Sequence, residues 1–201
     1  LATLSEMREK PAATMRICAG EHAVHRVVQP ALARLLSEYP DIKVELSIDH
    51  GFIDIVAKGF DAGIRLGEQV AKDMIAVRIG PSMRVAVVGS PAYFAKHPGP
   101  SIPEELTANR CINIRLPTYG GLLPWEFERD GRKLKVRVDG PLIFNTGGPR
   151  LDSALQGLGI AYMLEDIAAP FIAAGALVRV LEAWCPSFAG YHLYYPSRRL
   201  S

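Results

Sequence analysis

The sequence predicts an α/β fold, in which short apolar strands alternate with amphipathic helices. From residue 14 to residue 67 the apolar segments follow the order strand, helix, strand, helix, strand, which is typical of a parallel sheet with right-handed crossovers. The same alternation resumes after residue 83. Asp130 and Gly131, between two strand-like segments, form a strong turn signal and predict one antiparallel hairpin. At 201 residues the chain is long enough for one large domain or two small lobes.

The first half contains three predicted strands separated by two helices. Pro30 has no amide hydrogen and fits only the first turn of a helix, so we expect the first helix to start at Val27 or later. The second strand alternates apolar residues through Ile48, which predicts that Ile48 faces inward. Gly59 is expected to end the second helix in a left-handed conformation. In chain order the segments are strand 14–20, helix 25–40, strand 41–49, helix 51–59 and strand 60–67.

The second half begins with a strand that runs directly into a helix. Ser90 is predicted to cap that helix, and Pro91 is predicted to be its first residue. The segments that follow again alternate between β and α patterns. They are strands at 83–90, 111–116, 133–140 and 159–164, helices at 148–157 and 165–175, and β-rich segments at 177–181 and 190–197.

Composition and charge argue against several classes of protein. Apolar residues make up 49% of the chain and charged residues 22%, and the net charge of +2 includes no block of like charges, so we expect this chain alone not to bind DNA. No apolar segment approaches the roughly 20 residues needed to cross a bilayer. Cys18, Cys111 and Cys185 are odd in number and lie in or beside apolar segments, which favours reduced thiols and a cytoplasmic location.

Enzyme and metal signatures are missing from the sequence. The nucleophile-elbow, zinc-protease, dinucleotide-binding and phosphate-loop patterns do not occur. His22 and His25 are three residues apart, a spacing that could place both on one helix face for a metal, but no third ligand is near in sequence. The alternative for this pair is two separate polar contacts at a helix start. We therefore expect no enzymatic activity, no cofactor and no bound metal.

Arg65 is the first candidate binding residue. It shares a strand face with Gly63 and Gly67, whose missing side chains leave room beside it. At the carboxyl end of a parallel strand, a guanidinium can hold a carboxylate by paired hydrogen bonds. The alternative is an ion pair that joins the strand to a helix. Glu21 and His22 directly follow the first strand and either reach the same edge or cap the helix at the surface.

A second group of candidates follows strands in the other half of the chain. Asn145 and Thr146 end a strand, two glycines turn, and the next helix points its amides back toward the strand end. Helix amino ends bind anions. Met163 and Leu164 end another strand and are better suited to line an apolar wall than to perform chemistry. Together these strand ends predict a pocket with a few polar groups.

Four segments in this order resemble the C-terminal regulatory domain of LysR-type transcriptional regulators. They are FDAGIRLGE at 60–68, RVAVVGSPAYFAKHPGPSIPEELTANRCINIR at 84–115, GLGIAYMLEDIAAPFIAAGALVRVLEAW at 157–184 and YHLYYPSRR at 191–199. Each segment alone is weakly specific, but their order and spacing extend the resemblance over nearly the whole chain. The resemblance implies a type 2 periplasmic-binding-protein-like fold, with two α/β lobes joined by two crossover strands and an effector bound between them.

The resemblance also implies a division of the chain. Residues 1–13 would be the end of a linker helix and a connector, 14–86 together with 191–201 would form lobe I, and 87–190 would form lobe II. A winged helix-turn-helix that binds DNA would lie upstream and be absent from this chain. The implied function is effector sensing: a ligand that prefers one lobe arrangement shifts the population and changes how the DNA-binding domains span their operator.

The effector pocket that the resemblance implies draws residues from both lobes. His22 departs from the family, in which many relatives carry a small residue or a serine, so the imidazole either fills part of the cleft or contacts a distinctive ligand. The ligand-binding residues carried over are Glu21, His22, Asp49, His50, Arg65, Leu66, Gly67, Tyr119, Asn145, Thr146, Met163 and Leu164.

The partners implied are a small-molecule effector, a second copy in a homodimer (a tetramer for the full-length protein), and DNA only through the missing domain, with no membrane. Head-to-tail pairing would place the helix near 27–37 and the strand near 43–48 against the helix near 149–157 and the strand before it. The alternative function is a solute-binding receptor of a transport system with the same fold, which the full-length N-terminus would distinguish. A third possibility, an enzyme on this fold, lacks a recognisable nucleophile and base.

Overall fold

A computed structural model describes residues 14–49, 51, 54–67, 74–116 and 120–197 and divides the chain into two compact units. Unit 1 contains residues 1–81 and 189–201, and unit 2 contains residues 82–188. These boundaries lie a few residues before those predicted for the lobes, so the whole of the strand predicted at 83–90 belongs to unit 2. The predicted end of a linker helix lies outside the described residues.

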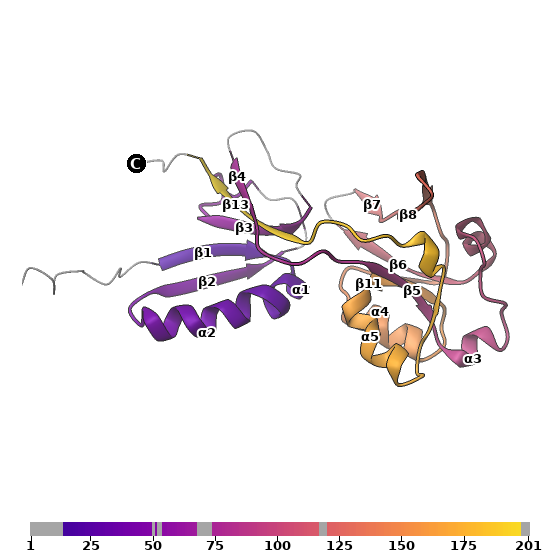
Figure 1. The fold of residues 1–201 in the computed structure, drawn as a ribbon. Coiled ribbons are helices and arrows are strands. Elements are labelled where there is room, and N and C mark those ends of the chain that lie inside the picture. The colour runs from indigo at the N-terminus through magenta and orange to yellow at the C-terminus, as the bar shows by residue number, and fades with distance from the viewer. Residues whose placement is uncertain (1–13, 50, 52–53, 68–73, 117–119, 198–201) are drawn as a thin grey trace, which may run out of the picture. The chain divides into compact units, whose positions relative to one another are not determined.

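Unit 1 is built on a five-stranded sheet with the order β2-β1-β3-β13-β4 (Figure 1). The three predicted strands of this half are present, and they pair in parallel. β13 returns from the far end of the chain and runs antiparallel to both β3 and β4. The bounds are β1 Thr14–Ala19, β2 Lys43–Ile48, β3 Ala62–Leu66, β4 Met74–Arg78 and β13 Tyr191–Pro196.

A continuous helical segment follows β1. It consists of α1 (Glu21–Ala23), a π-helical segment over Val24–Val28, and α2 (Gln29–Glu38). The helix therefore begins well before the predicted start at Val27. Pro30 has no amide hydrogen to donate to the preceding turn, and the π-helical segment that could accommodate this missing bond lies directly before α2.

Three further features of unit 1 differ from the prediction. In place of a helix at 51–59, the described residues form a hydrogen-bonded turn over 55–59, although Gly59 does adopt the predicted left-handed conformation. Ile48 is 55% exposed rather than turned inward, because β2 is an edge strand and Ile48 is its last residue. β4 was not predicted, and four of its five residues are exposed.

Unit 2 contains a six-stranded sheet in which β10, β6, β11, β5 and β12 follow one another and β7 pairs with β6. β10, β6 and β11 are parallel, whereas β5 and β12 are antiparallel to their neighbours. The bounds are β5 Val85–Gly89, β6 Cys111–Leu116, β7 Gly121–Leu122, β10 Leu142–Phe144, β11 Ile160–Leu164, β12 Val178–Val180, α3 Pro91–Phe94, α4 Gly148–Leu155 and α5 Glu165–Ala173, with 3₁₀ turns at Pro103–Ala108 and Glu182–Trp184.

Two local predictions for unit 2 are confirmed. The Ser90 side chain accepts a hydrogen bond from the amide of Tyr93 at 3.1 Å, as expected of a helix cap. β8 (Trp125–Arg129) and β9 (Arg132–Val136) form the predicted hairpin, in which Asp130 and Gly131 both have positive φ.

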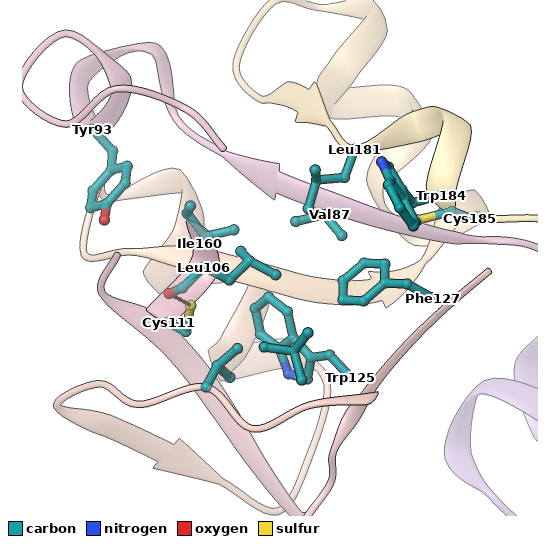
Figure 2. Packing of buried hydrophobic residues seen from close by; sticks show 12 residues of the cluster. Val87, Tyr93, Leu106, Cys111, Trp125, Phe127, Ile160, Leu181, Trp184 and Cys185 are labelled. Atoms are coloured by element: carbon teal, nitrogen blue, oxygen red, sulfur yellow. Dashed lines mark hydrogen bonds between the residues drawn. The ribbon is translucent and has the colours of Figure 1, made fainter. Parts of the chain in front are cut away.

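The sheet of unit 2 separates two apolar cores. On one face, Val87 packs in a cluster with Trp125, Phe127 and Trp184, and Figure 2 shows these side chains converging. Neighbouring residues of β5 point to the opposite face, where α4 and α5 cover a second cluster that includes Ala154, Ala161 and Met163. Both faces of the central strands are therefore buried, as the apolar character of their sequences predicts.

The chain passes between the units twice, and the two passages run beside each other. Ile79 donates to the carbonyl of Tyr191 at 2.9 Å, and Met83 and Phe188 exchange two backbone hydrogen bonds of 2.9 and 2.8 Å. A β-carbon at Gly190 would lie 1.9 Å from the carbonyl oxygen of Pro81, so only glycine permits this approach. Among the residues that the structure describes, no helix combines the length and apolarity that a membrane crossing requires.

Candidate functional site

In unit 1, the carboxyl ends of β1, β2 and β3 lie at one edge of the sheet because the strands are parallel and in register. Ala19 pairs with Ile48 on one side and with Ile64 on the other. The predicted polar residues follow these strand ends directly. Ligands of open α/β sheets bind outside the carboxyl ends of the strands, so this edge is the first place to examine.

Glu21 and His22 start the helical segment that follows β1. Glu21 is exposed and is the first residue of α1, where a carboxylate interacts favourably with the helix dipole. His22 is half-buried, and its Nδ1 lies 2.7 Å from the hydroxyl of Tyr191 on β13. His25 instead contacts the side chain of Gln29 at 3.0 Å. Within the described ranges, no group of three or more His, Cys, Asp or Glu side chains is arranged to bind a metal.

Asp49 organises the turn after β2. Its amide donates to the carbonyl of Ala19 at 3.0 Å, and its Oδ1 accepts from the amide of Gly51 at 2.7 Å. This carboxylate is therefore partly committed to its own loop. His50, its predicted neighbour in the pocket, lies outside the described residues.

Arg65 is half-buried and joins β3 to the Asp49 loop. Its Nη2 donates to the carbonyl of Gly51 at 2.6 Å and lies 3.5 Å from the Cys18 sulfur, and its Nη1 donates to the carbonyl of Ile64 at 2.9 Å. Its Nε is buried without a hydrogen-bond partner. Of the five N–H groups of a guanidinium, the Nε hydrogen and one Nη1 hydrogen therefore remain uncommitted. Arg65 cannot offer a carboxylate the predicted paired hydrogen bonds without releasing these contacts.

The space predicted beside Arg65 is only partly present. A β-carbon at Gly63 would lie 2.2 Å from the ring of Tyr194, so that ring, and not a ligand, covers the glycine. Gly67 differs: its φ is +77°, and a β-carbon there would meet nothing within 4 Å. Leu66, between them in the chain, is exposed. The open side of β3 is therefore its carboxyl end.

In unit 2, the parallel strands β10, β6 and β11 likewise end at one edge. Asn145 and Thr146 follow β10 and precede α4, and Asn145 is exposed whereas Thr146 is half-buried. α4 thus directs its amino end toward the loop that carries these two residues. Tyr119, predicted from the segment after β6, lies outside the described residues.

Met163 does not line an open wall as predicted. Its side chain is 2% exposed and belongs to the apolar core beneath α4 and α5. The reason is that β11 lies between β6 and β5 and that helices cover this face of the sheet. Leu164, the next residue, is half-buried.

Two features of unit 2 were missed from the sequence. A cavity of about 460 Å³ is lined by the buried Asn113, by Gly121, Leu122, Leu123 and Pro124, and by Arg137 and Val138. Arg150, in the first turn of α4, is buried although an arginine on a helix is normally exposed. The sequence did contain a signal for this. The spacing of Ser153 and Ala154 predicts a buried helix face, and Arg150 lies on that face.

Comparison with known proteins identifies the family. The family model of the LysR substrate binding domain matches residues 8–201. The chain belongs to this LysR family. A putative transcriptional regulator of Pseudomonas aeruginosa is 56% identical over 199 residues, which are 99% of this chain and 65% of that protein. The HTH-type transcriptional regulator PgrR of Escherichia coli is 42% identical over 199 residues, 99% of this chain and 67% of PgrR. The LysR-family chain therefore spans about two thirds of these relatives.

Solved structures agree with the family assignment. The regulatory domain of AphB in Vibrio vulnificus matches with a TM-score of 0.77 and 26% identity over 93% of this chain and 92% of that one. Full-length AphB of Vibrio cholerae, described as a virulence activator and a member of the LTTR protein family, matches with a TM-score of 0.76 and 26% identity over 92% of this chain and 62% of that one. The predicted two-lobed periplasmic-binding-protein-like fold is confirmed. The relatives are named transcriptional regulators, so the LysR-family domain is not an enzyme.

Proposed function

We propose that the chain senses a small organic anion as the effector-binding domain of a transcriptional regulator. The observation that carries this proposal is the match of the LysR substrate binding domain model over residues 8–201. The polar residues that follow the carboxyl ends of the parallel strands in both units support it, because ligands of such folds bind at these ends. The effector would contact predicted residues at these strand ends, among them His22, Asp49 and Asn145.

In this proposal the effector acts through a population shift. A ligand that binds one arrangement of the units more tightly than another stabilises that arrangement by the difference in its binding free energies. A DNA-binding domain upstream in the full-length regulator would then be repositioned on its operator in the cytoplasm. Arg65 holds the Asp49 loop through the carbonyl of Gly51, so a ligand that displaced this contact would alter the loop.

The effector-sensing proposal is tested by a thermal-shift screen of the chain against small carboxylates, amines and neutral metabolites. A ligand is accepted if it raises the melting temperature in proportion to its concentration and binds with a one-to-one stoichiometry in calorimetry. Asn145→Ala should weaken its binding. Lys133→Ala, an exposed residue of the β8–β9 hairpin, is the matched control and should not. The accepted ligand should then change the operator affinity of the full-length regulator, and an unchanged affinity would contradict effector sensing.

We also propose that the chain pairs with a second copy through α2 and β2. No residue of α2 is buried within the chain, although the helix carries three leucines, and β2 is an edge strand. An edge strand and an apolar helix face at the surface are features that a second copy would cover.

DNA binding is assigned only to the upstream domain, so the isolated chain should not shift duplex DNA in a gel at salt near 150 mM.

A further inference from the structure

Asn113 is a buried amide in the middle of β6. Its side chain is 1% exposed, and it is the third of the six residues of the strand, not one of those at the carboxyl end. Cys111, on the same strand face, belongs to the apolar core that contains Trp125 of the β8–β9 hairpin. Ile112, between them, belongs to the core beneath α4 and α5. Asn113 therefore points to the face of the sheet opposite α4.

Only one half of the Asn113 amide has a partner. Its Nδ2 donates to the carbonyl of Val138 at 3.4 Å, which is long for a hydrogen bond, whereas its Oδ1 is buried and accepts nothing from the described residues. This contact fixes the orientation of the amide, because a carbonyl oxygen can only accept and would repel Oδ1 in the place of Nδ2. Most buried side-chain oxygens have a donor, and one without a donor destabilises the fold.

The incompletely paired amide lies in the wall of the cavity of about 460 Å³ in unit 2. Asn113 and Val138, the two residues that the long hydrogen bond joins, both line this cavity. A cavity of this volume is in the range of small-molecule sites and far larger than one water molecule requires. The other residues that line it are Gly121, Leu122, Leu123, Pro124 and Arg137.

The lining residues define the chemistry of a matching ligand. Leu122, Leu123, Pro124 and Val138 supply apolar surface, and the cation of Arg137 disfavours a positively charged ligand. Oδ1 of Asn113 requires a donor, and no described residue accepts the second hydrogen of Nδ2. A carboxamide or a lactam has an N–H donor beside a carbonyl acceptor and can pair with both atoms. A ketone, an ester or a carboxylate has no N–H to donate.

We propose that this cavity is a second ligand site, which binds an uncharged carboxamide or lactam with an apolar body. The N–H of the ligand donates to Oδ1 of Asn113, and its carbonyl accepts from Nδ2. Oδ1 is closed to solvent, so binding requires a small rotation of the Asn113 amide. The terminal torsion of asparagine is soft, and the hydrogen bond that the rotation loosens is the long one to Val138. This site goes beyond effector sensing, because it lies on the other face of the sheet from α4 and takes a different class of ligand.

The test uses benzamide as the probe, with acetophenone and benzoate as matched comparisons. All three compounds have the same ring and a carbonyl or carboxylate group, but only benzamide has an N–H donor. Dissociation constants are measured by NMR titration of the isotope-labelled chain. Benzamide should bind about two- to tenfold more tightly than acetophenone, the factor expected for one neutral hydrogen bond. The backbone signals that move should include those of Leu122, Leu123 and Val138.

Three variants separate the amide contact from the cavity itself. Asn113→Leu keeps the approximate volume without the polar group, so benzamide and acetophenone should bind to it equally. Leu122→Trp occupies part of the cavity without changing Asn113 and should weaken both compounds. Gln156→Leu is the matched control, because it removes an exposed amide of the same unit that does not line the cavity, and it should leave both affinities unchanged.

The melting temperature without ligand separates a binding role from a structural one. Replacement of a partly paired buried amide by an apolar residue of similar shape should leave the melting temperature unchanged or raise it. A lower melting temperature for Asn113→Leu than for Gln156→Leu would show that the amide holds β6 to Val138, and would overturn the proposal. Equal affinities of the native chain for benzamide and acetophenone, or tighter binding of benzoate in this cavity, would overturn it as well.

Competition separates this site from the effector site. Benzamide should bind equally well when an accepted effector is present at saturation, because the two sites lie on different parts of the chain. Displacement by the effector, or movement of the signal of Asn145 in place of those of the cavity residues, would refute the cavity site while effector sensing stands. If benzamide binding depends on Asn113 but the screen yields no effector, the cavity site stands and the proposed function fails.

Discussion

Gly140→Ala should unfold unit 2 at a markedly lower urea concentration than the native chain does. Gly140 lies where the segment after β9 crosses the start of β6, and Cys111 donates its amide to the carbonyl of Asp139 there at 2.9 Å. A β-carbon at Gly140 would lie 1.9 Å from the carbonyl oxygen of Cys111 and 2.8 Å from its carbonyl carbon. These are backbone atoms and cannot rotate away, so the two segments must separate.

Separation of the two segments has two free-energy costs, which add. Overpacking of a filled interior costs about 1 to 3 kcal/mol. Separation also weakens the hydrogen bond of Cys111, which is fully buried, and a buried amide without its partner costs about 1 to 3 kcal/mol more. We expect a total loss of about 2 to 6 kcal/mol in the free energy of unfolding. With a urea slope of about 2 kcal/mol/M, the midpoint should fall by about 1 to 3 M.

Tryptophan fluorescence reports this transition selectively. The chain has 2 tryptophans, Trp125 and Trp184, and both lie in the same apolar core of unit 2. Gly147→Ala is the matched control, because a β-carbon there meets nothing within 4 Å and the φ of −79° suits any residue, so it should be neutral or slightly stabilising. If Gly140→Ala and Gly147→Ala unfold at the same midpoint, the close approach of the two segments is wrong.

Three other predictions concern stability and assembly. Arg65→Met should lower the free energy of unfolding by about 1 to 3 kcal/mol, measured by circular dichroism in urea, since it leaves the carbonyl of Gly51 without its donor; no loss would show that this contact contributes nothing. Burial raises the pKa of Cys111 from 9.0 to about 12, so the thiol of the unfolded chain ionises first as the pH rises. The free energy of unfolding should therefore fall by about 1.4 kcal/mol per pH unit between these values. Cys111→Ala should remove this contribution to the pH dependence, and an unchanged pH dependence would contradict the buried thiol. Leu36→Glu, at a position 39% exposed on α2, should convert a dimer into a 21.9 kDa monomer in light scattering, and a variant that stays dimeric would exclude this face.

The sequence predicts the elements of the fold well where local pattern and burial agree. The strands around Ile17 and Val87 and the hairpin at Asp130 and Gly131 are buried or have a decisive turn, and each appears where expected. β4 was missed because as an exposed strand it has no buried face to impose a two-residue period on its sequence. The early start of the helix at Glu21 depends on a π-helical turn, for which the sequence carries no simple signal.

The candidate site was predictable in position more than in chemistry. The residues at strand ends can be listed from the sequence because parallel strands share an edge. Asp49 and Asn145 do follow such ends, and Arg65 is the penultimate residue of β3. The sequence does not show which of their polar groups remain available to a ligand. That depends on contacts between segments distant in sequence, such as the contact of Arg65 with Gly51. The buried Arg150 was also missed, although its spacing from Ser153 and Ala154 puts it on the inner face of α4.

The position of β13 also sets an order of events during synthesis. β13 lies between β3 and β4 in the sheet of unit 1, yet Tyr191–Pro196 are translated after all of unit 2. A ribosome that adds about 5 to 20 residues per second exposes β3 and β4 for several seconds before the strand that joins them arrives. Unit 2, which is continuous in sequence, can fold during that interval. The part of the chain that emerges first is thus the last to be completed, and until then two strand edges remain open to wrong partners.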